Sequence, residues 1–115
     1  MTTWAAKLKY RRTPKGCLMR AYQYAKRRIV EGRGLYLGLG ICDRKDFYAE
    51  FETDPRFLEL HRAWIESGYQ KSERPTPDRA DTKRGYLVDN IVWETYETNT
   101  YRALNGYNRE RAEQV

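Results

Sequence analysis

At 115 residues the chain is the size of one small domain, and its composition is strongly polar, with 33% of residues charged and 40% hydrophobic. No apolar run approaches the roughly 18 residues that span a bilayer, and the N-terminal residues lack the apolar segment of a secretory signal. We therefore expect a cytoplasmic protein with no membrane association. Two cysteines, Cys17 and Cys42, are too few for a disulfide framework, so we expect free thiols.

Charge is concentrated in the first third of the chain. Residues 1–34 hold ten Lys and Arg and a single acid, Glu31, which gives a net charge of +9. The remaining residues hold twelve basic and fifteen acidic side chains, a net charge of −3. A basic region on a weakly acidic body is typical of a protein with a polyanion as partner, and we expect that partner to be DNA. The alternative is a solvated basic segment that has no partner.

The N-terminal region is predicted to be a loose arm over residues 1–13, followed by one helix over residues 14–31. Apolar residues recur in that second stretch at helical spacing, at Leu18, Tyr22, Ala25 and Ile29. Most of its basic residues lie off this apolar stripe, which predicts a helix that is apolar inside and basic outside. Gly32 and Gly34 end it, and residues 35–41 form an irregular or extended connection.

Two shorter helices are predicted in the middle of the chain. Asp43 is suited to cap the first, which contains Phe47 and Phe51 at a spacing of four. The pair Asp54-Pro55 is a strong start signal for the second, and Gly68 closes it. That helix presents Phe57, Leu60 and Trp64 on one face. Residues 71–77, with two prolines, are expected to be a connector.

The most informative stretch is residues 75–102. A short extended segment ends at Asp78-Arg79, and a turn follows that contains Gly85-Tyr86. Asp89-Asn90 then leads the apolar run 91–93, and Thr95 is placed to cap a final helix that contains Asn99 and ends near Gly106. The predicted fold is a small α+β domain, with a basic arm and helix over residues 1–34 and a second region over residues 35–115. We expect both regions to form one compact domain.

This order of strand, turn, strand and helix, with its polar residues, resembles the ββα-metal core (His-Me finger) of HNH endonucleases. The resemblance is to the small, zinc-free form common among bacteriophage proteins, and it covers about residues 40–104. It implies a metal-dependent DNA endonuclease or nicking enzyme, located in the host cytoplasm if the chain is phage-encoded. It also implies that Asp78 and Asn99 hold a divalent cation, Mg²⁺ or Mn²⁺, while Asn90 braces the loop. The spacing of Cys17, Cys42 and His61 matches no zinc site, and we expect no structural zinc.

The chain departs from the family pattern at Arg79, which stands where the first His is expected. A guanidinium stays protonated in proteins and cannot act as an ordinary base. Three roles stay open for Arg79: a phosphate contact in a working catalytic site, a remnant of a site that has lost catalysis, or a structural bridge to Asp78 or Asp81. In a working site with Arg79, Asn90 and Asn99 as catalytic residues, His61 and Tyr86 are the candidates for an alternative base.

Two functions therefore stay open. The first is the HNH-like endonuclease, and the second is a catalytically inactive phage accessory protein that uses the same fold to bind DNA or to inhibit a host or defence protein. Both predict phosphate contacts from basic side chains, namely Lys26, Arg27, Arg28, Lys83, Arg84 and Arg102.

Overall fold

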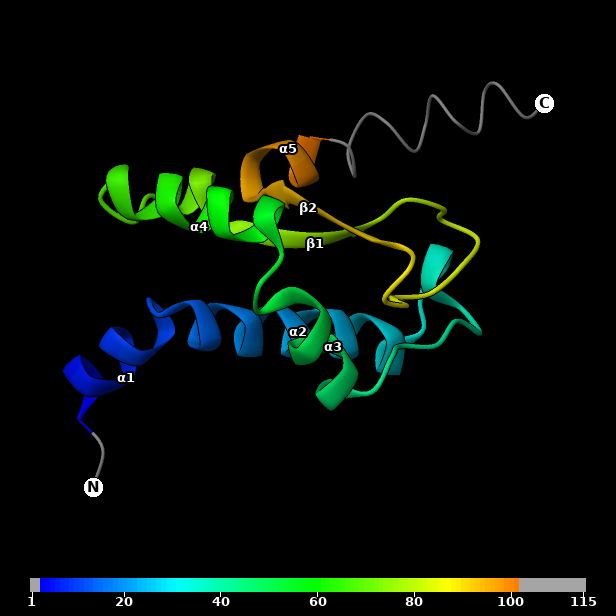
Figure 1. Cartoon of the computed structure of the whole chain (residues 1–115). Helices are drawn as coiled ribbons and strands as arrows, with labels where there is room; N and C mark the ends of the chain where they lie inside the picture. The colour runs from blue at the N-terminus through cyan, green and yellow to red at the C-terminus, as the bar shows by residue number, and fades with distance from the viewer. Residues whose placement is uncertain (1–2, 102–115) are drawn as a thin grey trace.

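Five α-helices and one two-stranded antiparallel sheet make up residues 3–101, the part of the chain that the computed structural model describes (Figure 1). The helices are α1 (Trp4–Arg11), α2 (Pro14–Glu31), α3 (Arg44–Phe51), α4 (Pro55–Glu66) and α5 (Tyr96–Tyr101). The strands are β1 (Pro75–Arg79) and β2 (Ile91–Thr95), and two short 3-10 turns lie at Gly34–Tyr36 and Lys71–Glu73. The predicted α+β class is confirmed. Among residues 3–101, no helix is long and apolar enough to cross a membrane.

The first thirteen residues differ from the prediction of a loose arm, because α1 is a helix. The Thr3 hydroxyl caps it by accepting a hydrogen bond from the Ala6 backbone N–H at 3.2 Å. No residue of α1 is buried, so the helix has no apolar stripe that periodicity could detect. Its end is fixed by close packing on α2, where a side chain at Gly16 would run into the Tyr10 carbonyl.

Helix α2 has the predicted boundaries. Thr13 caps its start by accepting a hydrogen bond from the Gly16 N–H at 3.0 Å, and Gly32 ends it in the left-handed region, with φ of 56°. One face is buried, and its apolar members are Cys17, Leu18, Ala21, Tyr22 and Ala25. The predicted cap of α4 is also present, since the Asp54 carboxylate accepts a hydrogen bond from the Phe57 N–H at 2.9 Å.

The core is built largely from aromatic rings around Trp93 of β2. Ring centroids of Phe57, Phe51 and Phe47 lie 4.8, 5.4 and 6.0 Å from that of Trp93. Edge-to-face contacts at such distances each add about 0.5–1.5 kcal/mol beyond the burial of apolar area. This cluster joins α3 and α4 to β2, and thereby fixes the sheet against the helices.

The sheet pairs Pro75 with Thr95 at one end and Arg79 with Ile91 at the other. Helix α5 begins directly after β2, with the Thr95 hydroxyl accepting a hydrogen bond from the Thr98 N–H at 3.1 Å, as predicted for a cap. The two strands lie between α2 and α5, which contact β1 from different sides (Figure 1). β1 therefore forms part of a wall that faces α2.

The connection between the strands, residues 80–90, is docked against the segment that precedes α3. The Tyr86 N–H donates to the Gly40 carbonyl at 3.0 Å, and the Cys42 N–H donates to the Tyr86 carbonyl at 2.8 Å. A side chain at Gly85 would collide with the Gly40 backbone, so glycine is required at that position for the two segments to meet.

Replacing Gly85 with alanine should therefore destabilise the domain. We expect Gly85→Ala to lower the free energy of unfolding by about 1–3 kcal/mol or more, because the two backbones must move apart. Gly40→Ala is the matched control, since a Cβ there meets nothing within 4 Å and the change should stay within about 0.5 kcal/mol. Urea unfolding followed by tryptophan fluorescence measures both. Equal stability of the two variants would contradict this packing.

Candidate functional site

The side-chain amide of Asn90 holds the 80–90 connection in place. Its Oδ1 accepts a hydrogen bond from the Asp81 N–H at 2.9 Å, and its Nδ2 donates to the carbonyls of Asp81 and Gly85 at 3.0 and 2.9 Å. The residue is only 2% exposed. One amide thus satisfies three backbone groups in a segment that has no regular secondary structure to pair them.

Arg79 binds the same connection from the end of β1. Its Nη1 donates to the carbonyls of Thr82 and Arg84 at 2.8 and 3.2 Å. The guanidinium carbon lies 4.3 Å from the centre of the Tyr36 ring, within cation–π range. Arg79 is buried, so its charge sits inside the fold among loop carbonyls and aromatic rings. These contacts give the side chain a bracing role within the loop.

The two candidate metal ligands lie on neighbouring elements. Asp78 is buried at the end of β1, where its Oδ1 accepts a hydrogen bond from the Arg79 N–H at 2.8 Å. Asn99 is buried on α5, and its Nδ2 donates to the Thr76 hydroxyl at 3.1 Å and to the Pro77 carbonyl at 3.2 Å. Because a carbonyl can only accept a hydrogen bond, the atom of the Asn99 amide that faces the Pro77 carbonyl is the nitrogen, Nδ2. The oxygen, Oδ1, is the remaining polar atom of this side chain. Asn99 is therefore anchored to the residue that precedes Asp78.

A carboxylate and an amide oxygen are the donor types that Mg²⁺ and Mn²⁺ prefer. Two such donors fit an ion that keeps several waters and takes further oxygens from a phosphate, as Mg²⁺ commonly does. Within residues 3–101, no three His, Cys, Asp or Glu side chains come together as a metal-binding group. Asp78 and Asn99 therefore offer oxygen donors of the types that such a cation takes.

The two candidate bases have other contacts. His61 is buried on α4, where its Nε2 lies 2.8 Å from the Arg12 carbonyl and therefore carries the proton of that hydrogen bond. The contact ties α4 to the junction of α1 and α2. The Tyr86 hydroxyl accepts a hydrogen bond from Arg28 Nη1 at 3.0 Å, and burial raises the pKa of the phenol above its ordinary value. A phenol with a raised pKa is poorly suited to take a proton at neutral pH.

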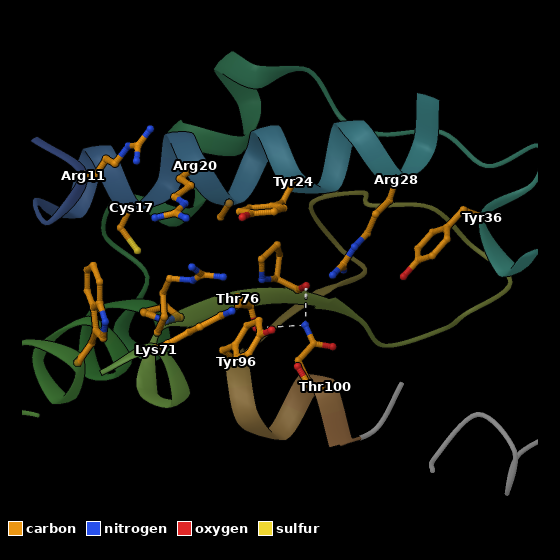
Figure 2. Close-up of a pocket in the computed structure, with 16 residues that line it drawn as sticks. Arg11, Cys17, Arg20, Tyr24, Arg28, Tyr36, Lys71, Thr76, Tyr96 and Thr100 are labelled. Carbon is orange, nitrogen blue, oxygen red and sulfur yellow. Dashed lines mark hydrogen bonds between the residues drawn. The ribbon is translucent and has the colours of Figure 1, made fainter. Parts of the chain in front are cut away.

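A cavity of about 380 Å³ opens between α2 and the wall formed by β1 and α5 (Figure 2). Five cationic side chains line it: Arg11, Arg20, Arg28, Lys71 and Arg74. Figure 2 shows Arg20, Tyr24 and Arg28 extending from α2, opposite Lys71, Tyr96 and Thr100. Two adjoining hollows share Arg11, Arg20 and Tyr24 with this cavity and add Lys7, Arg12 and Arg27. We call the three together the cationic groove. Among the described residues, no Asp or Glu side chain lines it.

Cations and tyrosine rings alternate across the groove. The Arg74 guanidinium carbon lies 5.5 Å from the Tyr24 ring centre on α2 and 5.1 Å from the Tyr96 ring centre on α5. Arg20 lies 5.7 Å from Tyr24, and Lys71 Nζ lies 4.8 Å from Tyr96. Burial, and then the nearby charge of Arg20, lowers the pKa of Arg74. The second cause reflects the positive charge of the surroundings, which favours an anion nearby.

Some of the basic residues predicted to bind phosphate line the groove, and others lie outside it. Arg28 lines the cavity between α2 and the β1–α5 wall, and Arg27 lines an adjoining one while its Nε pairs with Glu31 at 3.2 Å. Lys26 and Lys83 are exposed outside the groove, and Arg84 pairs with Asp89 at 3.0 Å. Arg102 lies outside the described residues.

The sequence analysis did not single out most of the groove, namely Arg11, Arg20, Lys71, Arg74, Tyr24 and Tyr96. One signal was present, because Arg20, Tyr24 and Arg28 recur at a spacing of four and so share a face of α2. Lys71 and Arg74 had no comparable signal, since they lie in a connector that only the tertiary fold brings opposite α2.

Comparison with family models, with curated proteins and with solved structures finds no match to this chain. The features of the structure that bear on function are the contacts of Asp78 and Asn99 and the cationic groove.

Removing the Asn90 amide should unfold its loop. We expect Asn90→Ala to lower the free energy of unfolding by about 2–4 kcal/mol, because three partly or fully buried backbone groups lose their partner. Asn90→Asp keeps the shape but directs a carboxylate at two carbonyl oxygens, so it should be no more stable than alanine at pH 7. That contact would raise the pKa of the new carboxyl in the folded state, so its stability should increase as pH falls.

The control is Asp89→Asn, which removes only the exposed pair with Arg84 and should change stability by less than about 1 kcal/mol. Urea unfolding at pH 4 and pH 7 measures all three variants. An Asn90→Asp variant as stable as the unmodified chain at pH 7 would contradict the assigned hydrogen bonds.

Proposed function

We propose that this chain binds DNA along the cationic groove. The observation that supports this most strongly is that, among residues 3–101, five cationic side chains and no carboxylate line one cavity between α2 and the β1–α5 wall. An array of cations without acids attracts a polyanion and repels positively charged partners. The groove is also extended, because the α2 residues Arg20 and Arg28 are eight positions apart, about 12 Å along a helix. That length suits several successive phosphates better than one small anion.

A second candidate function adds cleavage of that DNA by an HNH-like, metal-dependent endonuclease or nicking activity. The specific observation that favours it is the position of Asn99, which lines the groove and is anchored to Pro77, next to Asp78. In this proposal Asp78 and Asn99 would hold Mg²⁺ or Mn²⁺, a cation that supplies Lewis acidity toward a phosphate oxygen when it is bound. Asn90 and Arg79 would position the strand end that bears Asp78.

Binding without cleavage is the alternative, as in an inactive phage accessory protein of the same fold. It is favoured by the contacts of the remaining candidates, since Arg79 braces the loop while His61 and Tyr86 have structural partners. Such a protein could act on DNA itself or on a host protein that binds DNA.

The groove can be tested by neutralising two cations on opposite walls. We expect Arg20→Gln combined with Lys71→Gln to weaken DNA binding roughly tenfold or more and to reduce the slope of log K against log salt by about two. The matched control is Lys45→Gln with Arg62→Gln, which removes the same charge from exposed positions on α3 and α4. Fluorescence anisotropy between 50 and 200 mM salt provides the measurement. Equal losses in both double variants would show that net charge, and not the groove, drives binding.

Cleavage can be tested at Asp78 with a substitution that preserves the hydrogen bond to the Arg79 N–H. If the chain nicks plasmid DNA in Mg²⁺ or Mn²⁺, Asp78→Asn should reduce nicking at least 100-fold and leave DNA affinity within about twofold. Asp89→Asn, an exposed change in the 80–90 connection that follows β1, should nick normally. Nicking that persists in Asp78→Asn would exclude this site. A wild-type chain that binds DNA and nicks in neither metal would establish the non-catalytic alternative.

A further inference from the structure

The cationic groove has features that a surface for double-stranded DNA does not need. Its cations face into a hollow between two walls, and its polar lining is interrupted by tyrosine rings (Figure 2). Phosphates of a duplex are met by cations on an open surface or by an element that enters a groove of the DNA. A groove that combines cations with aromatic rings is instead typical of sites for unpaired strands.

One side chain, that of Arg74, contacts both walls of the groove. The Arg74 guanidinium contacts both the Tyr24 ring on α2 and the Tyr96 ring on α5, at 5.5 and 5.1 Å. The thickness of a planar guanidinium is smaller than the width of a base pair. A duplex, which has two backbones, does not fit in a space where one guanidinium contacts both walls. One nucleobase, which is also planar, has suitable dimensions for this space.

The rings present surface to a ligand. Tyr24 is 42% exposed although it lies on the face of α2 that borders the groove. Arg20 and Arg74 lie beside the Tyr24 ring, so a cation would be near the phosphate that adjoins a base stacked on this ring. Stacking on tyrosine tolerates any base, because every base offers a π face.

We infer that the groove takes an unpaired stretch of DNA, with a base stacked on Tyr24 or Tyr96 and the flanking phosphates at Arg20, Arg28 and Lys71. This inference rests on the proposed DNA binding and names the form of DNA that the groove accepts. It places the unpaired strand beside Asn99, at the wall that leads to Asp78. The incoming base would take the place of the Arg74 guanidinium between the two rings. That guanidinium would then be able to bind a phosphate of the strand.

The test compares oligonucleotides of about 12 nucleotides, within the site sizes of single-strand binders, as one strand and as the duplex of the same sequence. We expect the single strand to bind at least tenfold more tightly in fluorescence anisotropy at the same salt concentration. Tyr24→Ala should weaken single-strand binding about fivefold to 100-fold, whereas Tyr24→Phe keeps the ring and should stay within about twofold. Tyr101→Ala, an exposed change on α5 outside the groove, should have no effect.

The possible outcomes distinguish failure of this inference from failure of the proposed DNA binding. Binding of neither probe would overturn both. A second outcome is that the duplex binds as tightly as the single strand or more tightly, with a loss in the variant Arg20→Gln with Lys71→Gln but none in Tyr24→Ala. That result would support DNA binding by the groove and overturn the inference that the bound DNA is unpaired. Tighter binding of an RNA strand of the same sequence would overturn the assignment to DNA. Thermal unfolding of each variant confirms that a loss of binding is not a loss of fold.

Discussion

The arrangement of the C-terminal half depends on the side-chain amide of Asn90. Its three hydrogen bonds close a connection whose buried backbone groups would otherwise have to be met by water. With the connection closed, Gly85 and Tyr86 reach the segment before α3, and Arg79 reaches two further carbonyls of the same loop. The loop then holds β1 against β2, and β1 supplies one wall of the groove. The Asn90 amide therefore braces the connection next to β1, although it does not line the groove itself.

The groove brings together like charges, and tyrosine rings reduce the unfavourable energy of that arrangement. Arg74 is partly buried near Arg20, and both burial and that neighbouring charge lower its pKa. Contacts with the electron-rich faces of Tyr24 and Tyr96 offset part of this, by about 0.5–2 kcal/mol each. An array that is strained by its own charge gains more from an incoming phosphate than a dispersed one does. In the proposed DNA complex, a phosphate would reduce the repulsion between these cations.

Local signals in the sequence predicted the elements whose boundaries are set locally. The cap and proline at Asp54-Pro55 and the glycine at Gly32 gave the ends of α4 and α2 correctly. Helix α1 escaped prediction because it buries no residue and so has no apolar period, and its packing depends on Gly16 meeting the Tyr10 carbonyl. The groove was not predicted from the sequence for a related reason. Its walls come from residues about fifty positions apart, and no local pattern indicates which basic residues will face each other.

The contacts of Arg79 explain why arginine suits its position without assigning it a chemical step. Its Nη1 spans two carbonyls of the loop while the guanidinium covers the Tyr36 ring, and these contacts need both length and several fixed donors. A neutral imidazole has one N–H donor and a shorter reach, so histidine there could not brace the loop in the same way. In the proposals above, cleavage depends on Asp78 and Asn99, whereas DNA binding depends on α2, Lys71 and Arg74. Because different residues support the two proposed activities, a loss of cleavage would not by itself remove the proposed DNA binding.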